Sequence, residues 1–123
     1  MNRLFYTDKL TYRNNVCICD PKKVEKFIRF HGGMYDDVVR AADNIYKEFG
    51  KNIQLELRIK KIWETGPEHL LLITRLPIYD DTIMDRLDVI SDLLGLDDAD
   101  HGGWLILTTD FKIYTSVNNF EVI

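Results

Sequence analysis

The segment from Ile53 to Leu76 constrains the fold most, because it contains two strand patterns of different character joined by one turn. Between residues 53 and 60 apolar side chains alternate with polar ones, which is typical of a strand with one buried face and one face toward water. The alternation slips at Lys60-Lys61, which predicts a bulge. After a turn at residues 65–68, the residues from 69 to 76 are apolar on both sides, so we expect a central strand there.

Three helices are expected, two before this strand pair and one after it. They are predicted over residues 21–31, from about 36 to 49, and from about 81 to 94. Asp20-Pro21 supplies an N-cap followed by proline at the first helical position of the first helix. Gly50 and Gly95 are expected to end the second and third helices, because glycine is favoured just after a helix C-terminus.

Further strands are predicted near both ends of the chain. Segments 10–13 and 16–19 flank Asn14-Asn15 and predict a hairpin with a tight turn. Later strands are predicted over residues 104–109, 112–117 and 120–123. The expected order is β-hairpin-α-α-β-β-α-β-β. We therefore expect residues 1–123 to form a single α+β domain, with an antiparallel sheet and helices packed on one face.

The charge of the chain is unevenly distributed along the sequence. Residues 1–75 contain 14 Lys and Arg against 10 Asp and Glu, whereas residues 76–123 contain 2 against 10. The halves therefore carry +4 and −8, which sum to the net charge of −4. Such asymmetry bears on binding partners and association rates, not on the fold. The N-terminus lacks the apolar core of a signal peptide and no apolar run could span a membrane, so a cytoplasmic location is expected.

The third predicted helix carries a stripe of aspartates on one face. At about 100° per residue, Asp81, Asp85, Asp88 and Asp92 lie close together, opposite the apolar residues Ile83, Leu87, Ile90 and Leu94. Aspartate is a poor helix former, and like charges four residues apart repel. The stripe therefore lowers local helix stability. This cost favours the interpretation that the surface is used for binding, but a face exposed only to water would have the same pattern.

The acidic stripe matches the charge spacing of a nucleic acid. Carboxylates on one helix face recur every ~5–6 Å, which is comparable with the phosphate spacing along a strand, where each strand carries one charge per ~3.4 Å of rise. The stripe is expected to extend into a loop through Asp97, Asp98 and Asp100. A basic groove that binds nucleic acid could accept this surface in place of its substrate.

Other candidate sites receive less support from the sequence. His31, His69 and His101 belong to no recognisable catalytic motif, and Cys17 and Cys19 lack the further ligands of a metal site. The loop that starts at Asp98 departs from the calcium-loop pattern, so no metal or cofactor is expected. Basic side chains gather on the first helix and on the polar face of the first strand of the pair, but the negative net charge argues against direct nucleic-acid binding.

Residues 34–109 resemble the regulator of ribonuclease activity B family, whose members inhibit ribonuclease E. The likeness rests on the acidic second half and on a helix followed by the acidic loop Asp97-Asp98-Ala99-Asp100 and the pair Gly103-Trp104. The family pattern has Asp before Gly-Trp where this chain has Gly102, and it has an acidic tail that this chain lacks. The resemblance implies a small α+β domain that binds an RNA-processing enzyme.

These observations favour a non-enzymatic inhibitor or regulator. The expected partner is the basic surface of a nucleic-acid-processing enzyme, such as a nuclease, a CRISPR effector or a toxin, so an anti-CRISPR or immunity protein would fit. Two alternatives stay open. One is a homo-oligomeric scaffold, for example a homodimer that pairs the basic half of one copy with the acidic half of another. The other is a small enzyme that uses His31 and Cys17.

Overall fold

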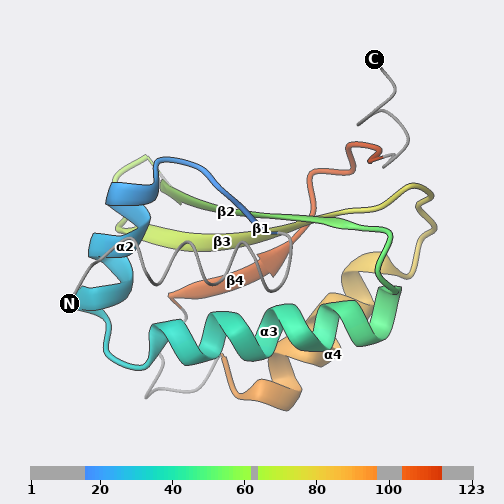
Figure 1. Cartoon of the computed structure of the whole chain (residues 1–123), viewed down its shortest axis with the longest axis horizontal. Helices are drawn as coiled ribbons and strands as arrows, with labels where there is room; N and C mark the ends of the chain where they lie inside the picture. The colour runs from blue at the N-terminus through green and yellow to red at the C-terminus, as the bar shows by residue number, and fades with distance from the viewer. Residues whose placement is uncertain (1–15, 62–63, 97–103, 115–123) are drawn as a thin grey trace.

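The computed structural model describes residues 16–61, 64–96 and 104–114. Within these ranges four strands form one mixed sheet and three helices accompany it, which confirms the predicted α+β class. The elements in chain order are β1 Val16–Ile18, α2 Pro21–Phe30, α3 Met34–Phe49, β2 Gln54–Lys61, β3 Glu68–Arg75, α4 Ile83–Leu94 and β4 Leu105–Thr108 (Figure 1).

The sheet is mixed, so the prediction of an antiparallel sheet was wrong. Strands follow the order β1-β2-β3-β4, and only the central pair β2 and β3 is antiparallel. β1 runs parallel to β2, and β4 runs parallel to β3. The reason is that helices separate the strands of each parallel pair. Such a crossover returns the chain to the end of the sheet where the preceding strand began.

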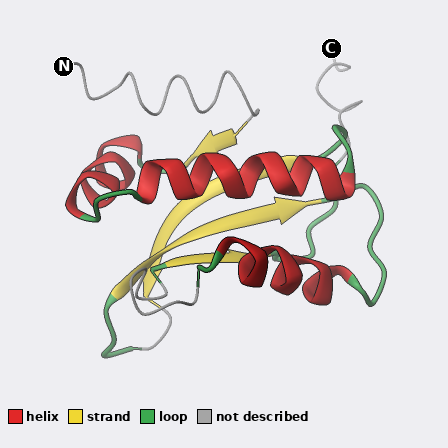
Figure 2. Ribbon diagram, turned by 90° about the horizontal axis from the view of Figure 1, so that it is seen from below, coloured by secondary structure: helices red, strands yellow, loops and turns green. Residues whose placement is uncertain are grey.

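Helices α3 and α4 cover one face of the sheet, as Figure 2 shows from below. The strand residues that face them are aliphatic and almost fully buried, among them Leu55 and Leu57 in β2 and Leu70 and Leu72 in β3. α2 packs against β2 and α3 at one end of the molecule (Figure 1). β3 is central, as predicted, and the opposite face of the sheet lacks a helix among the described residues.

Two helix starts differ from the predictions. α4 begins at Ile83 after Thr82, not at Asp81, because the carboxylate of Asp80 accepts hydrogen bonds from the Thr82 backbone N–H at 2.8 Å and from the Thr82 hydroxyl at 2.6 Å. This local turn places Asp81 before the helix. α3 begins at Met34, directly after Gly33, whose φ of 83° suits glycine.

The strand ends also refine the predictions. β2 remains in register with β3 through Lys60 and Lys61, so the predicted bulge is absent from this ladder. Helices α3 and α4 end at Gly50 and Gly95, as expected, and both glycines have positive φ. After β4, Ile113 forms an isolated parallel bridge with Leu76. The predicted turn at residues 14–15 and most of the strands beyond residue 114 lie outside the described residues.

Candidate functional site

Helix α4 has one buried face and one exposed face. Ile83, Leu87 and Ile90 are buried against the sheet and α3. Asp85, Asp88 and Asp92 are exposed on the opposite side, and Asp81 is exposed in the turn that precedes the helix. The predicted stripe is therefore placed on the surface. The loop aspartates Asp97, Asp98 and Asp100 lie outside the described residues.

The four aspartates are not neutralised by the described part of the chain. None of their carboxylates forms an ion pair or a hydrogen bond there. Arg86 is the sole cation in α4, and it is engaged elsewhere. Its Nε donates to a carboxylate oxygen of Glu48 in α3 at 2.7 Å, and its guanidinium lies 4.3 Å from the centre of the Phe49 ring. Within the described residues, the carboxylates of α4 are thus exposed and unpaired.

Two aliphatic side chains lie beside the acidic stripe. Val89 is 63% exposed and Leu93 is 72% exposed, and they are four residues apart on the same face of α4. The sequence reasoning missed them because it counted only the apolar residues that repeat toward the core. Val89 lies four residues after Asp85 and Leu93 directly follows Asp92, and this spacing was the signal available in the sequence. Together these residues form the α4 face, which consists of Asp81, Asp85, Asp88, Val89, Asp92 and Leu93.

The structure places His31 and Cys17 among different neighbours. The His31 ring stacks on Phe27 at a centroid distance of 4.2 Å and lies 4.9 Å from the Trp104 ring. Cys17 lies in β1 opposite Glu56 of β2, and its Sγ accepts a hydrogen bond from Gln54 at 3.8 Å. The described residues show no contact between the two side chains. Within the same ranges, no group of three or more His, Cys, Asp or Glu side chains could hold a metal ion.

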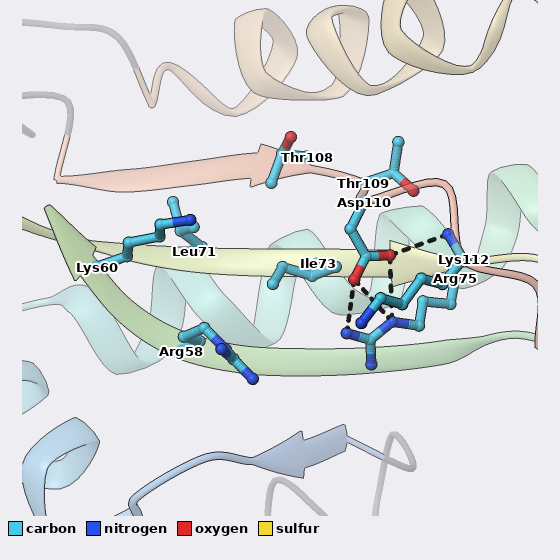
Figure 3. Close-up of a pocket in the computed structure, with 9 residues that line it drawn as sticks. All are labelled: Arg58, Lys60, Leu71, Ile73, Arg75, Thr108, Thr109, Asp110 and Lys112. Atoms are coloured by element: carbon cyan, nitrogen blue, oxygen red, sulfur yellow. Dashed lines mark hydrogen bonds and ion pairs between the residues drawn. The ribbon is translucent and has the colours of Figure 1, made fainter. Parts of the chain in front are cut away.

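The face of the sheet opposite the helices carries a groove of about 280 Å³ (Figure 3). Its floor is formed by Leu71 and Ile73 of β3, while Arg58 and Lys60 approach from β2 and Lys112 from the segment after β4. The described residues that line it are Arg58, Lys60, Leu71, Ile73, Arg75, Thr108, Thr109, Asp110 and Lys112. A second hollow on the β1 side of the sheet shares Arg58 and Lys60 with this groove.

One end of the groove is closed by a network around Arg75. The Arg75 guanidinium donates to Asp110 through Nη2 at 2.7 Å and to Glu56 through Nη1 at 2.6 Å. These bonds hold the pKa of the Asp110 carboxyl below its ordinary value. Burial alone would raise the pKa of Glu56, but hydrogen bonds from Arg75 and Arg58 outweigh it and lower that pKa. Arg75 is therefore a structural cation that ties three segments together.

The remaining cations of the groove are less engaged. Arg58 donates to Glu56 through Nε at 2.8 Å and Nη2 at 2.7 Å, which leaves Nη1 with no partner among the described residues. Lys60 and Lys112 form no ion pair within the same ranges. The sequence indicated Arg58 and Lys60 as exposed cations on a strand, but it gave no sign that Lys112, some 50 residues later, would join them.

Comparisons with known proteins identify no relative. No family model, no curated protein and no solved structure matches this chain. Among the described residues, no helix is long and apolar enough to cross a membrane.

Proposed function

We propose that the protein is a non-enzymatic inhibitor or regulator that docks its α4 face on the basic groove of a nucleic-acid-processing enzyme. The observation that carries this proposal is a set of four exposed carboxylates along α4 and its preceding turn, none of which is paired within the described chain. Surface acids are commonly paired with nearby cations or dispersed among them. Here the negative charge is concentrated and left available.

The spacing of these carboxylates supports nucleic-acid mimicry. From Asp85 to Asp88 and from Asp88 to Asp92 the helix advances by about 4.5 and 6 Å, at 1.5 Å per residue. A nucleic-acid strand presents one phosphate for each ~3.4 Å of axial rise. A cationic groove shaped for phosphates can therefore place successive Lys or Arg side chains on successive aspartates of a helix about 18 Å long.

Val89 and Leu93 add apolar contact area to the acidic α4 face. Charge complementarity mainly accelerates association and selects partners, whereas buried apolar side chains at the centre of an interface slow dissociation. Because both residues are largely exposed beside the aspartates, they can anchor the face once the charges have aligned it. This combination favours a protein partner over a small cation or a counterion atmosphere.

The class of target follows from the same chemistry. Nucleases, CRISPR effectors and nucleic-acid-directed toxins all present cationic grooves, so an anti-CRISPR or immunity role fits the proposal. The sequence resemblance to the ribonuclease E inhibitors favours an RNA-processing enzyme among these classes.

A charge-reversal experiment tests the proposal. The tagged protein is used to capture partners from cells that encode it, and the affinity of each purified partner is measured by calorimetry across a salt series. We expect Asp85→Lys combined with Asp88→Lys to weaken binding at least about hundredfold, because like charges placed together in an interface cost several kcal/mol. We also expect the affinity of the unmodified protein to fall with added salt.

A matched control separates local charge from total charge. Asp36→Lys combined with Glu64→Lys changes the net charge equally at two exposed acids outside the α4 face. This control is expected to retain most of the affinity. Equal weakening by the two double variants, or binding that ignores both salt and charge reversal, would remove the proposal.

A further inference from the structure

The groove on the open face of the sheet is chemically distinct from the α4 face. It lies on the side of the sheet away from the covering helices, and its cations come from two strands of the antiparallel pair and from the segment after β4 (Figure 3). Nothing in the proposed docking through α4 uses it. Ligand binding in this groove is therefore independent of docking through the α4 face.

Among the described residues, the charges around the groove do not balance. Four cations line it, namely Arg58, Lys60, Arg75 and Lys112. Two carboxylates offset them, because Asp110 lines the groove and Glu56 pairs with both arginines. Four minus two leaves a surplus of two positive charges. Since Arg75 is fully occupied by Asp110, Glu56 and Gln54, the surplus belongs to Lys60 and Lys112.

The shape of the groove limits the size of a ligand. Its volume of about 280 Å³ lies just below the ~300–1,000 Å³ range of small-molecule sites. The floor is apolar, although Leu71 is only 7% exposed and Ile73 only 6%. Lys60 and Lys112 lie toward opposite ends of it, and Arg58 lies along one side (Figure 3). Such a site suits a compact molecule that has one strongly anionic group and an uncharged remainder.

We propose that the groove formed by Lys60, Lys112 and Arg58 over Leu71 and Ile73 binds a small phosphate monoester. A phosphate monoester carries roughly −1.5 to −2 at neutral pH, which matches the surplus of two. Its terminal oxygens can accept hydrogen bonds from the Lys and Arg side chains that line the groove. A carboxylate carries one charge on two oxygens and would leave part of the surplus unmatched. The uncharged part of the ester lies along the aliphatic floor.

An NMR titration tests this assignment on the whole chain. Amide spectra are recorded while inorganic phosphate is added at constant ionic strength, and then with glycerol phosphate and with adenosine monophosphate. We expect saturable shifts at Leu71, Ile73, Thr108 and Thr109. Tighter binding of glycerol phosphate would indicate a headgroup-like ligand, tighter binding of adenosine monophosphate would indicate a nucleotide, and equal binding would indicate recognition of the phosphoryl group itself. All three results support the site.

Two double variants test whether Lys60 and Lys112 are responsible for phosphate binding. Lys60→Gln combined with Lys112→Gln is expected to weaken phosphate binding at least about tenfold, because charge-assisted contacts carry the affinity. Lys22→Gln combined with Lys26→Gln makes the same charge change on exposed residues of α2 and is expected to change little. The proposal is overturned by unsaturable shifts, by equal loss in both variants, or by binding of a single-stranded oligonucleotide when none of the three phosphates binds. The α4 face is intact in both variants.

Discussion

At the scale of single residues, Arg75 joins three segments of the described structure. Its side chain is 14% exposed and bonds to Gln54 and Glu56 in β2 and to Asp110 after β4. Charged groups that are removed from water must be matched by close partners, and here three hydrogen-bonding partners surround one guanidinium. The pKa of Arg75 is accordingly raised, with the bond to Asp110 as the largest cause.

We expect Arg75→Met to destabilise the protein by about 2–3 kcal/mol, because Glu56 and Asp110 lose a shared partner and Glu56 stays largely buried. Arg58→Met is the control, since Arg58 also bonds to Glu56 but its side chain is 46% exposed. The control is expected to cost about 1 kcal/mol or less. Urea denaturation followed by circular dichroism measures both. Equal losses would show that Arg75 does not hold the network together.

The same network predicts how stability depends on pH. The pKa values of Glu56 and Asp110 are lowered in the folded chain from ordinary values of 4.5 and 3.8. A lowered folded pKa stabilises the protein fully above the ordinary value, and the contribution is lost as pH falls through the folded value. We therefore expect melting temperature to decrease as the pH is lowered below about 4.5, and the difference between the natural protein and Arg75→Met to shrink there. A difference that grew with acidity would contradict this.

At the scale of elements, the surface charge of α4 favours the stability of the helix at one end and opposes it at the other. Asp85 lies in the first turn, where the helix dipole favours a carboxylate. Asp92 lies near the C-terminal end, where the dipole disfavours it, and it is four residues from Asp88. If the α4 face serves in binding, its charge at Asp92 lowers the stability of the helix that carries it.

We expect Asp92→Lys to stabilise the protein by about 0.5–1 kcal/mol, because it favours the dipole and pairs with Asp88. Asp85→Lys makes the same charge change at the favourable end and is expected to stabilise less or to destabilise. Melting temperatures at low and high salt measure both effects, which salt should reduce. A loss of stability in Asp92→Lys would show that the aspartate has a structural role.

Much of the element pattern could be predicted from the sequence, whereas the partners of each strand could not. The alternation at residues 53–60 and the apolar segment after residue 69 identified β2 and β3, because burial leaves a period of two. The same periodicity does not encode strand direction, so the parallel pairing of β4 with β3 was missed. Arg75 and Asp110 are 35 residues apart, and their contact depends on that pairing.

At the scale of the whole molecule, one core lies between the sheet and the helices α3 and α4, and two charged surfaces lie outside it. Leu72 in the central strand is 0% exposed and belongs to this core, whereas Val89 on α4 points outward. We expect Leu72→Ala to destabilise the fold by about 2–5 kcal/mol through lost burial and a cavity. Val89→Ala is expected to stay within about 0.5 kcal/mol. Similar losses by chemical denaturation would contradict this layout.

Competition between the protein and nucleic acid for the captured enzyme tests docking through the α4 face. The affinity of the captured enzyme for the unmodified protein is measured by fluorescence anisotropy, while increasing amounts of the nucleic acid that the enzyme binds are added. We predict strict competition, in which the apparent association constant falls in proportion to the fraction of enzyme occupied by nucleic acid. In the proposed docking the aspartates of α4 and the phosphates bind the same cations. Formation of a ternary complex, with affinity unchanged at saturating nucleic acid, would contradict docking of the α4 face in that groove.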